Sequence, residues 1–140
     1  GRTWQVVETP MNQGSEMTGS FGMAMAADGR HGLLVGGDWS EKERAEGSMA
    51  RTVDGGRMWA ALPGLGYRSC VQFDPSDETG QRAVAIGTPG MSVTTDGGQT
   101  WVASPVSDTL FYTGRYGAGG EVVWLAGRGV IAQWFTGLEE

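Results

Sequence analysis

Short apolar runs alternate with turns rich in Gly, Pro, Asp and Ser along most of this chain. The clearest stretch has the runs RSCVQF (68–73), RAVAIG (82–87), MSVTT (91–95) and TWVAS (100–104), separated by DPSDETG, TPG and DGG. β-Prone runs of this length between turn residues are typical of strands in an all-β protein. The pattern therefore predicts four short antiparallel strands in this stretch.

The same succession of runs occurs on either side of this stretch. The runs before it are FGMAMAA (21–27), HGLLVGG (31–37), SMART (48–52) and MWAAL (58–62), and those after it are LFYTGRY (110–116), EVVWLAG (121–127) and VIAQWF (130–135). The third unit has no fourth strand. We therefore place three units at approximately 21–62, 67–104 and 109–135 of a single domain covering 1–140, with a strand at 3–8 as a closing or orphan outer strand.

An eight-residue phrase accompanies the repeat. TVDGGRMW (52–59) and TTDGGQTW (94–101) share Thr, Asp, two Gly and Trp, and GRTW (1–4) matches the end of the phrase. Its marked residues are Thr52, Asp54, Gly56, Trp59, Thr94, Asp96, Gly98, Thr100, Trp101 and Trp4. In such a phrase the Asp accepts hydrogen bonds from turn amides, the Gly residues take positive φ, the Thr hydroxyl ties the turn and the Trp packs between strands. We interpret the phrase as structural, because nothing in it needs a substrate.

Repeats of about 40 to 50 residues with four strands and a fixed aromatic and turn signature are typical of β-propeller blades. The alternative is a β-sandwich, which has similar strands and turns but no reason to repeat an eight-residue phrase. Three blades are too few to close a ring, since propellers have at least about four. We therefore expect either the C-terminal half of a longer propeller, with a truncated N-terminus, or a homodimer completing a six-bladed ring in which residues 3–8 of one copy complete the last blade of the other.

The phrase resembles the Asp-box, or bacterial neuraminidase (BNR) repeat, of sialidases, sortilin-type receptors and photosystem II stability/assembly factor-like propellers. The match is complete at 94–101, while Met58 replaces the usual Thr in the earlier copy. The succession from VGGDW (35–39) to WLAGRGVIAQW (124–134) is similar to the C-terminal half of bacterial assembly-factor-like propellers. This resemblance implies a non-catalytic module that binds a protein or peptide partner, in a periplasmic or extracellular location.

Charge and composition narrow the classes of partner. The net charge of -6 and the pI of about 4.7 argue against nucleic acid, because phosphate binding requires a basic surface. No run of eighteen apolar residues is present, so no membrane span is predicted. Cys70 and His31 are the single Cys and the single His, which is too few for a common zinc site. We expect no metal and no cofactor.

Two catalytic arrangements could draw on residues of this chain. A Ser/His/Asp arrangement would have to use His31, but this residue lies in the turn DGRHG, and no G-x-S-x-G phrase is present. A sialidase-like glycoside hydrolase is expected to use three Arg, a Tyr with a Glu partner and an Asp. Parts of that set exist in Arg68 beside Tyr67, in Arg115 beside Tyr112 and Tyr116, and in Arg128. No spacing singles them out, so glycoside hydrolysis stays the alternative function and no catalytic residue is assigned.

The remaining hypothesis is a binding surface. Arg68 and Arg115 lie on or near first strands, which line the channel of a propeller, and Arg128 follows a second strand. A ring of Arg could hold a carboxylate or a peptide C-terminus through bidentate hydrogen bonds. The candidate binding residues are Arg68, Arg115, Arg128, Tyr67 and Asp38. In the alternative interpretation each Arg pairs with an acid such as Asp38, Asp74 or Asp108, and the charged insertion EKERAEG (41–47) is either a partner contact or a solvated loop.

Overall fold

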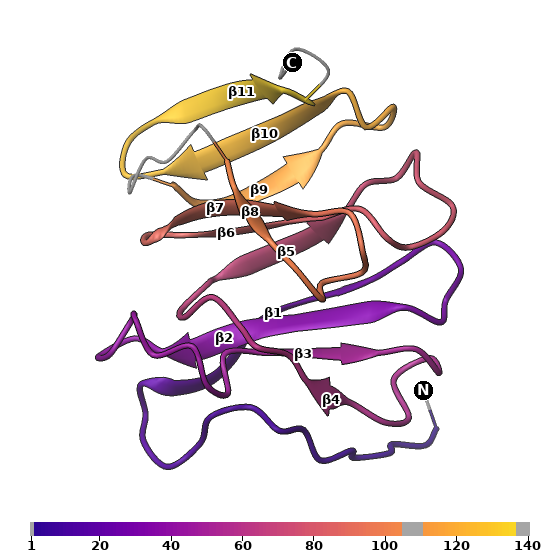
Figure 1. Ribbon diagram of the computed structural model, residues 1–140, viewed down its shortest axis with the longest axis vertical. Helices are drawn as coiled ribbons and strands as arrows, with labels where there is room; N and C mark the ends of the chain where they lie inside the picture. The colour runs from indigo at the N-terminus through magenta and orange to yellow at the C-terminus, as the bar shows by residue number, and fades with distance from the viewer. Residues whose placement is uncertain (1, 105–110, 137–140) are drawn as a thin grey trace.

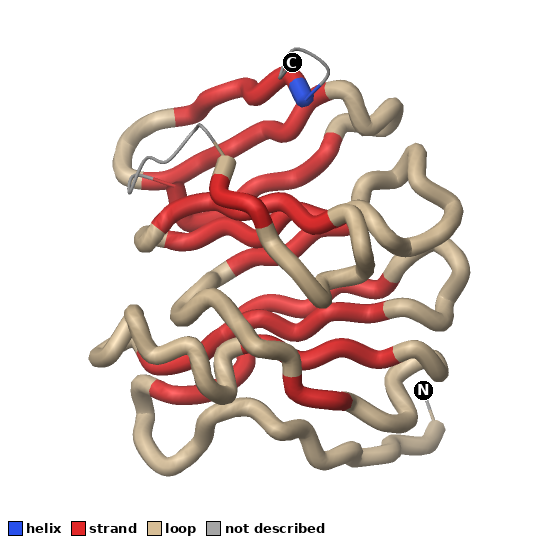
Figure 2. Tube along the Cα trace, viewed as in Figure 1, coloured by secondary structure: helices blue, strands red, loops and turns tan. Residues whose placement is uncertain are grey.

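Three antiparallel sheets are stacked one upon another in the computed structural model, which describes residues 2–104 and 111–136 (Figures 1 and 2). The first sheet contains β1 (Thr18–Met25), β2 (Gly32–Asp38), β3 (Met49–Thr52) and β4 (Ala60–Ala61); the second contains β5 (Cys70–Phe73), β6 (Ala83–Gly87), β7 (Gly90–Thr94) and β8 (Val102–Ala103); the third contains β9 (Phe111–Tyr116), β10 (Val122–Gly127) and β11 (Ile131–Phe135). Within each sheet, each strand pairs with the next one in the chain. The predicted all-β class and the three blade-like sheets are confirmed.

The first strand of each sheet lies closest to its neighbours. β1 contacts β5, and β5 contacts β9, so these three strands form one side of the stack. The second and third strands extend away from that side, and β4 and β8 are the outermost strands of their sheets. This is the arrangement of propeller blades around an axis, with the first strand innermost.

The core lies between the sheets. Leu33 and Val35 of β2 pack with Val71 and Ala85 of the second sheet. Val84, Ile86 and Met91 pack with Val123 and Leu125 of the third sheet. Every residue of β2 and β6 is buried, because these strands are covered on both faces. This explains why their sequences are continuous apolar runs without polar alternation.

The outermost strands are shorter than the runs that predicted them. Only Ala60–Ala61 and Val102–Ala103 pair with β3 and β7. The preceding residues belong to the turns, since the Trp59 indole N–H donates to the Gly56 carbonyl and the Trp101 indole N–H donates to the Gly98 carbonyl. The turn therefore takes residues that the apolar pattern assigns to the strand.

The predicted strand at 3–8 is not formed in the single chain. Residues 2–10 are loop and lie next to the first sheet at the lower end of the stack in Figure 1. Trp4 is 95% exposed and Val6 is 90% exposed. A strand requires a neighbouring strand to satisfy its N–H and C=O groups, and this segment has none here. Pairing with another copy stays a prediction.

No helix in the described residues is long or apolar enough to cross a membrane.

Candidate functional site

The first repeated turn, Thr52–Trp59, is held by a Thr and an Asp side chain. The Thr52 hydroxyl donates to Asp54 Oδ1 at 2.8 Å and accepts from the Gly56 N–H at 2.9 Å. The same Asp54 oxygen accepts the N–H groups of Arg57 and Met58, both at 3.0 Å. These contacts satisfy four polar groups of a tight turn without any external ligand.

The second repeated turn, Thr94–Trp101, has the same arrangement. The Thr94 hydroxyl donates to Asp96 at 2.8 Å and accepts from the Gly98 N–H at 2.9 Å, and Asp96 accepts the Thr100 N–H at 2.9 Å. The Thr100 hydroxyl adds a donor to Asp96 at 2.5 Å, which Met58 cannot do in the first turn. Hydrogen bonds from Thr100 lower the pKa of Asp96 from 3.8 to about 2.

The depressed pKa of Asp96 predicts a specific pH dependence. An Asp whose folded pKa is lowered contributes stability that is complete above its unfolded pKa of 3.8 and is lost as pH falls toward about 2. We expect Asp96→Asn to lower the free energy of unfolding by about 1 kcal/mol at pH 7 and to make the decline between pH 4 and pH 2 shallower. Urea titrations at a series of pH values measure both effects.

Glu8→Gln is the control for this experiment, because Glu8 is an exposed carboxylate in the N-terminal loop. It should reproduce the pH profile of the unsubstituted chain. An Asp96→Asn profile parallel to that of the unsubstituted chain would contradict the assigned role of Asp96.

A hollow lies at the opposite end of the strands from the two repeated turns. Its volume is about 290 Å³, and its lining residues are Trp39, Lys42, Tyr67, Ser69, Thr88, Tyr112 and Arg128. We call it the loop-end hollow. The repeated turns follow β3 and β7, whereas these residues precede β5, lie at the start of β9, or follow β2, β6 and β10. Three sheets therefore contribute to one concave surface.

The loop-end hollow combines cations with aromatic rings. Arg128 Nε donates to the Tyr112 hydroxyl at 3.4 Å, which raises the pKa of Arg128 above its ordinary value. Lys42 Nζ lies 4.4 Å from the centre of the Trp39 ring, within cation–π range. Thr88 Oγ1 is buried and has no hydrogen-bond partner. The arrangement offers positive charge and a free hydroxyl between apolar walls.

Two other contacts fix the wall of the hollow. The Ser69 hydroxyl donates to the backbone carbonyl of Tyr112, which ties the second sheet to the third. Tyr67 packs edge-on against Phe21 with ring centroids 5.5 Å apart, and burial raises the pKa of Tyr67. The first sheet therefore contacts the Tyr67 ring through Phe21, and Ser69 fixes the backbone at Tyr112.

The structure separates the three predicted arginines. Arg128 lines the loop-end hollow, whereas Arg115 lines a groove on the outer face of the third sheet together with Trp124 and Ile131. Arg68 is buried beside the hollow, where its Nη1 donates to the Tyr67 carbonyl at 2.9 Å and its Nε has no partner. Burial lowers the pKa of Arg68. The three arginines thus do not line one common hollow.

The alternative of paired arginines fits these residues no better. Within residues 2–104 and 111–136, side-chain ion pairs join His31 to Asp28 and Arg82 to Asp74, and none includes Arg68, Arg115 or Arg128. Asp38 instead accepts hydrogen bonds from Ser40, which lower its pKa. Asp108 lies outside the described residues.

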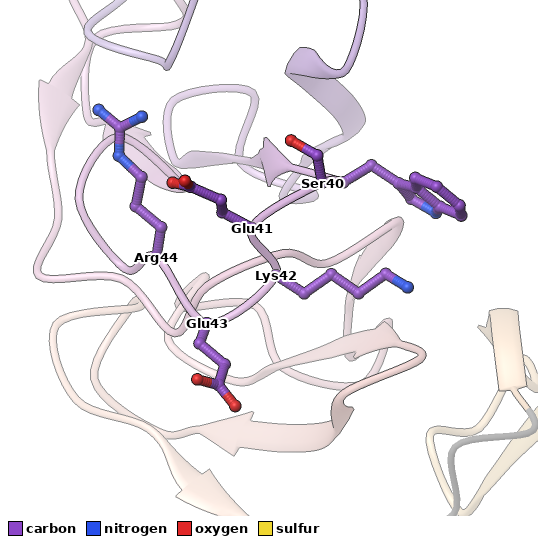
Figure 3. A pocket seen from close by; sticks show the side chains of 6 residues that line it. Ser40, Glu41, Lys42, Glu43 and Arg44 are labelled. Atoms are coloured by element: carbon purple, nitrogen blue, oxygen red, sulfur yellow. The ribbon is translucent and has the colours of Figure 1, made fainter.

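The charged insertion forms a loop beside this site. A second hollow of about 630 Å³ is lined by Trp39 and the five residues 40–44. Figure 3 shows Glu41 and Glu43 pointing apart, with Lys42 directed away from both. The two carboxylates therefore do not face a common point, as a pair acting on one glycosidic bond would. No cluster of three or more His, Cys, Asp or Glu suited to a metal ion occurs among the residues that the structure describes.

Sequence reasoning missed Thr88 and Ser69 and noted Trp39 and Lys42 without assigning them to a site. Thr88 follows Gly87 at the end of β6, as Arg128 follows Gly127 at the end of β10. Aligning the repeats at these glycines would have placed Thr88 next to Arg128. The insertion offers no such signal, because it has no counterpart in the other two units.

Comparison with known proteins gives the fold alone. No protein-family model matches this sequence, and no curated protein matches it. The structure is similar to the crystal structure of an ancestral GH74 enzyme, with a TM-score of 0.59, 14% sequence identity, and coverage of 86% of this chain and 19% of that chain. GH74 is a β-propeller family, and an identity this low carries no activity across. The chain is thus a partial β-propeller of three blade-like sheets.

Proposed function

We propose that this chain is a non-catalytic β-propeller module that binds a protein or peptide partner through a carboxylate at the loop-end hollow. The observation that carries the proposal is the lining of that hollow, where the described residues include Lys42 and Arg128 but no Asp or Glu. The chain as a whole has a net charge of -6, so two unpaired cations at one concave surface are a local exception. Such a site attracts an anionic group of a partner.

The chemistry of the lining favours a peptide carboxylate over a simple ion. The Nε of Arg128 is held by Tyr112, which fixes the guanidinium plane, and an Arg fork binds a carboxylate through two parallel hydrogen bonds. Trp39, Tyr67 and Tyr112 supply rigid apolar area for the rest of a side chain or terminus. The repeated turns resemble Asp-boxes, and the assembly-factor-like propellers that share them are expected to act by binding.

Glycoside hydrolysis is the second candidate, favoured by the structural similarity to an ancestral GH74 enzyme. The site geometry argues against a sialidase-like form of it. Arg68, Arg115 and Arg128 do not line one common hollow, and among the described residues that line the loop-end hollow there is no acid to serve Tyr67 or Tyr112. Turnover of a fluorogenic sialoside by the purified chain would contradict the non-catalytic proposal.

The test measures binding of a fluorescein-labelled acidic octapeptide with a free C-terminal carboxylate. Fluorescence anisotropy of the label reports the bound fraction. We expect Arg128→Gln to weaken binding about tenfold, since a hydrogen bond to a charged group contributes about 1.5 kcal/mol or more. Lys42→Gln should weaken it less, because a single ammonium lacks the bidentate fork. Arg30→Gln is the matched control: Arg30 is exposed in the turn between β1 and β2, at the opposite end of the strands.

An equal loss in all three variants would indicate attraction to surface charge in general and would contradict a site at the hollow. The C-amidated peptide distinguishes a terminal carboxylate from acidic side chains. If only the free carboxylate binds, the partner is recognised by its C-terminus.

A further inference from the structure

Among the described residues, the third sheet presents an exposed apolar face at the end of the stack. Ile131 is 75% exposed and Trp124 is 48% exposed on this face, together with Phe135. Ile131 and Trp124 line a groove of about 380 Å³ together with Ala126 and Arg115. Large apolar side chains gathered on one sheet face mark a surface that another element covers.

The equivalent face of the second sheet shows what covers such a surface. Ala126 pairs with Ile131 just before the β10–β11 turn, as Ile86 pairs with Met91 just before the β6–β7 turn. Two residues earlier, Trp124 occupies the position of Val84. Val84, Ile86 and Met91 are fully or almost fully buried against the third sheet. By position, the outer face of the third sheet is built to receive another sheet.

Within residues 2–104 and 111–136, no fourth strand pairs with the outer edge of the third sheet. In the first sheet the Leu62 N–H donates to the Met49 carbonyl, and in the second the Ser104 N–H donates to the Met91 carbonyl, both at 3.0 Å. Each donor lies three residues after the Trp of its repeated turn. In the third sheet Ile131 occupies the position of Met91, and β11 is the edge strand. The missing donor is a residue three positions after a Trp.

Val7 is such a residue, since it lies three positions after Trp4. Residues 2–10 form no strand, and Trp4 and Val6 are almost wholly exposed. Met11, by contrast, is buried against Leu34 and Ala50, and the Asn12 N–H donates to the Gly47 carbonyl at 2.9 Å. The chain is therefore anchored from Met11 onward. The segment before it has a β-prone sequence but pairs with no strand.

We propose that two copies of this chain pair end to end. The outer face of the third sheet of each copy receives the outer face of the first sheet of the other, where Met23 and Met25 are exposed. Residues 5–7 of the other copy pair with β11 as its fourth strand. Two such contacts, related by a two-fold axis, join the three sheets of each copy into one ring of six. Six is within the number of blades that closed propellers have. The second copy thus covers both the open edge and the apolar face.

Sedimentation equilibrium of the purified chain over a range of concentrations tests the proposal. We expect a dimer of twice 14.8 kDa. Ile131→Glu should weaken dimerisation by at least about a hundredfold, because an unpaired charge would be buried at the interface. Val102→Glu is the matched control, since Val102 is 72% exposed on the outermost strand of the second sheet and should leave the dimer intact.

A proline pair tests the added strand separately. Val7→Pro removes the N–H that would donate to the Ile131 carbonyl, and we expect dimerisation to weaken about tenfold or more. Val6→Pro removes an N–H that would point away from β11, because donors alternate along an antiparallel edge, and it should have a much smaller effect. Circular dichroism should show that all four variants keep their strands, because Ile131, Val102 and Val6 are exposed and Val7 lies in a loop.

A chain that is monomeric at every concentration would overturn the proposal. So would a dimer whose affinity is unchanged by both Ile131→Glu and Val7→Pro, or an open polymer with no defined end. A dimer lost with Ile131→Glu and Val7→Pro but kept with Val102→Glu and Val6→Pro is the result that supports it.

Discussion

Gly36→Ala should lower the free energy of unfolding by about 3 kcal/mol or more. A Cβ at this position would lie 1.9 Å from the carbonyl oxygen of Gly19 and 2.9 Å from its carbonyl carbon. Both are backbone atoms, so no side-chain rotation relieves the clash. β2 cannot shift away either, because the Gly36 N–H donates to the Ser48 carbonyl and its own carbonyl accepts the Arg68 N–H. Urea denaturation followed by circular dichroism measures the loss.

Gly119→Ala is the control for this prediction. Gly119 lies in the loop between β9 and β10, and a Cβ there would have no neighbour within 4 Å. Its cost should stay within about 0.5 kcal/mol, as for other exposed positions. The register of β1 against β2 shifts between Ser20 and Gly22, next to the contact between Gly36 and Gly19. Similar losses in the two variants would show that this irregular part of β1 adapts to a side chain, contrary to the geometry at Gly19.

The central strands could be predicted from the sequence because their environment is uniform. β2 and β6 are covered on both faces, so the apolar runs HGLLVGG and RAVAIG leave little doubt about where they lie. The repeated turns were equally readable, since Asp54 and Asp96 need a Thr two residues earlier and glycines directly after them. Local chemistry and packing agree at these positions.

The segment at 3–8 shows where local chemistry stops being sufficient. Its residues are β-prone, but a strand forms only beside another strand, and the single chain places none there. A repeated phrase identifies the role of a segment within a blade. It does not say which chain supplies the rest of that blade.

The residues of the candidate site could be predicted only in part, because the side of a sheet on which a strand residue lies depends on how the strands are paired. Arg115 was expected at the channel because it lies on a first strand, but it pairs with Trp124 and shares the outer face of the third sheet. Successive residues of a strand point to opposite faces, so the face depends on the register, which sequence patterns alone leave open. Arg128 and Tyr67 both line the loop-end hollow, because turn and strand-end positions do not depend on that choice.

Gly98→Ala and Gly56→Ala occupy the same place in the two repeated turns but should differ in cost. Both glycines have positive φ, +93° at Gly98 and +89° at Gly56, so each Ala incurs about 1–2 kcal/mol of backbone strain. At Gly98 the Cβ would also lie 2.7 Å from Leu33 Cδ2 and 3.2 Å from Leu62 Cδ1. At Gly56 its nearest neighbour is Trp59, at 3.7 Å. We expect Gly98→Ala to cost about 1–3 kcal/mol more than Gly56→Ala.

A double-mutant cycle with Leu33→Ala isolates this extra cost. Leu33 is almost fully buried between the first and second sheets, and its truncation alone should cost about 2–5 kcal/mol. In combination with Gly98→Ala the total should be smaller than the sum, because the shortened side chain makes room for the new Cβ. When Leu33→Ala is combined with Gly56→Ala, the two losses should add, because a Cβ at Gly56 would have only Trp59 within 4 Å. Strict additivity in both cycles would contradict a contact between the new Cβ at Gly98 and Leu33. Any difference in cost between Gly98→Ala and Gly56→Ala would then have another cause.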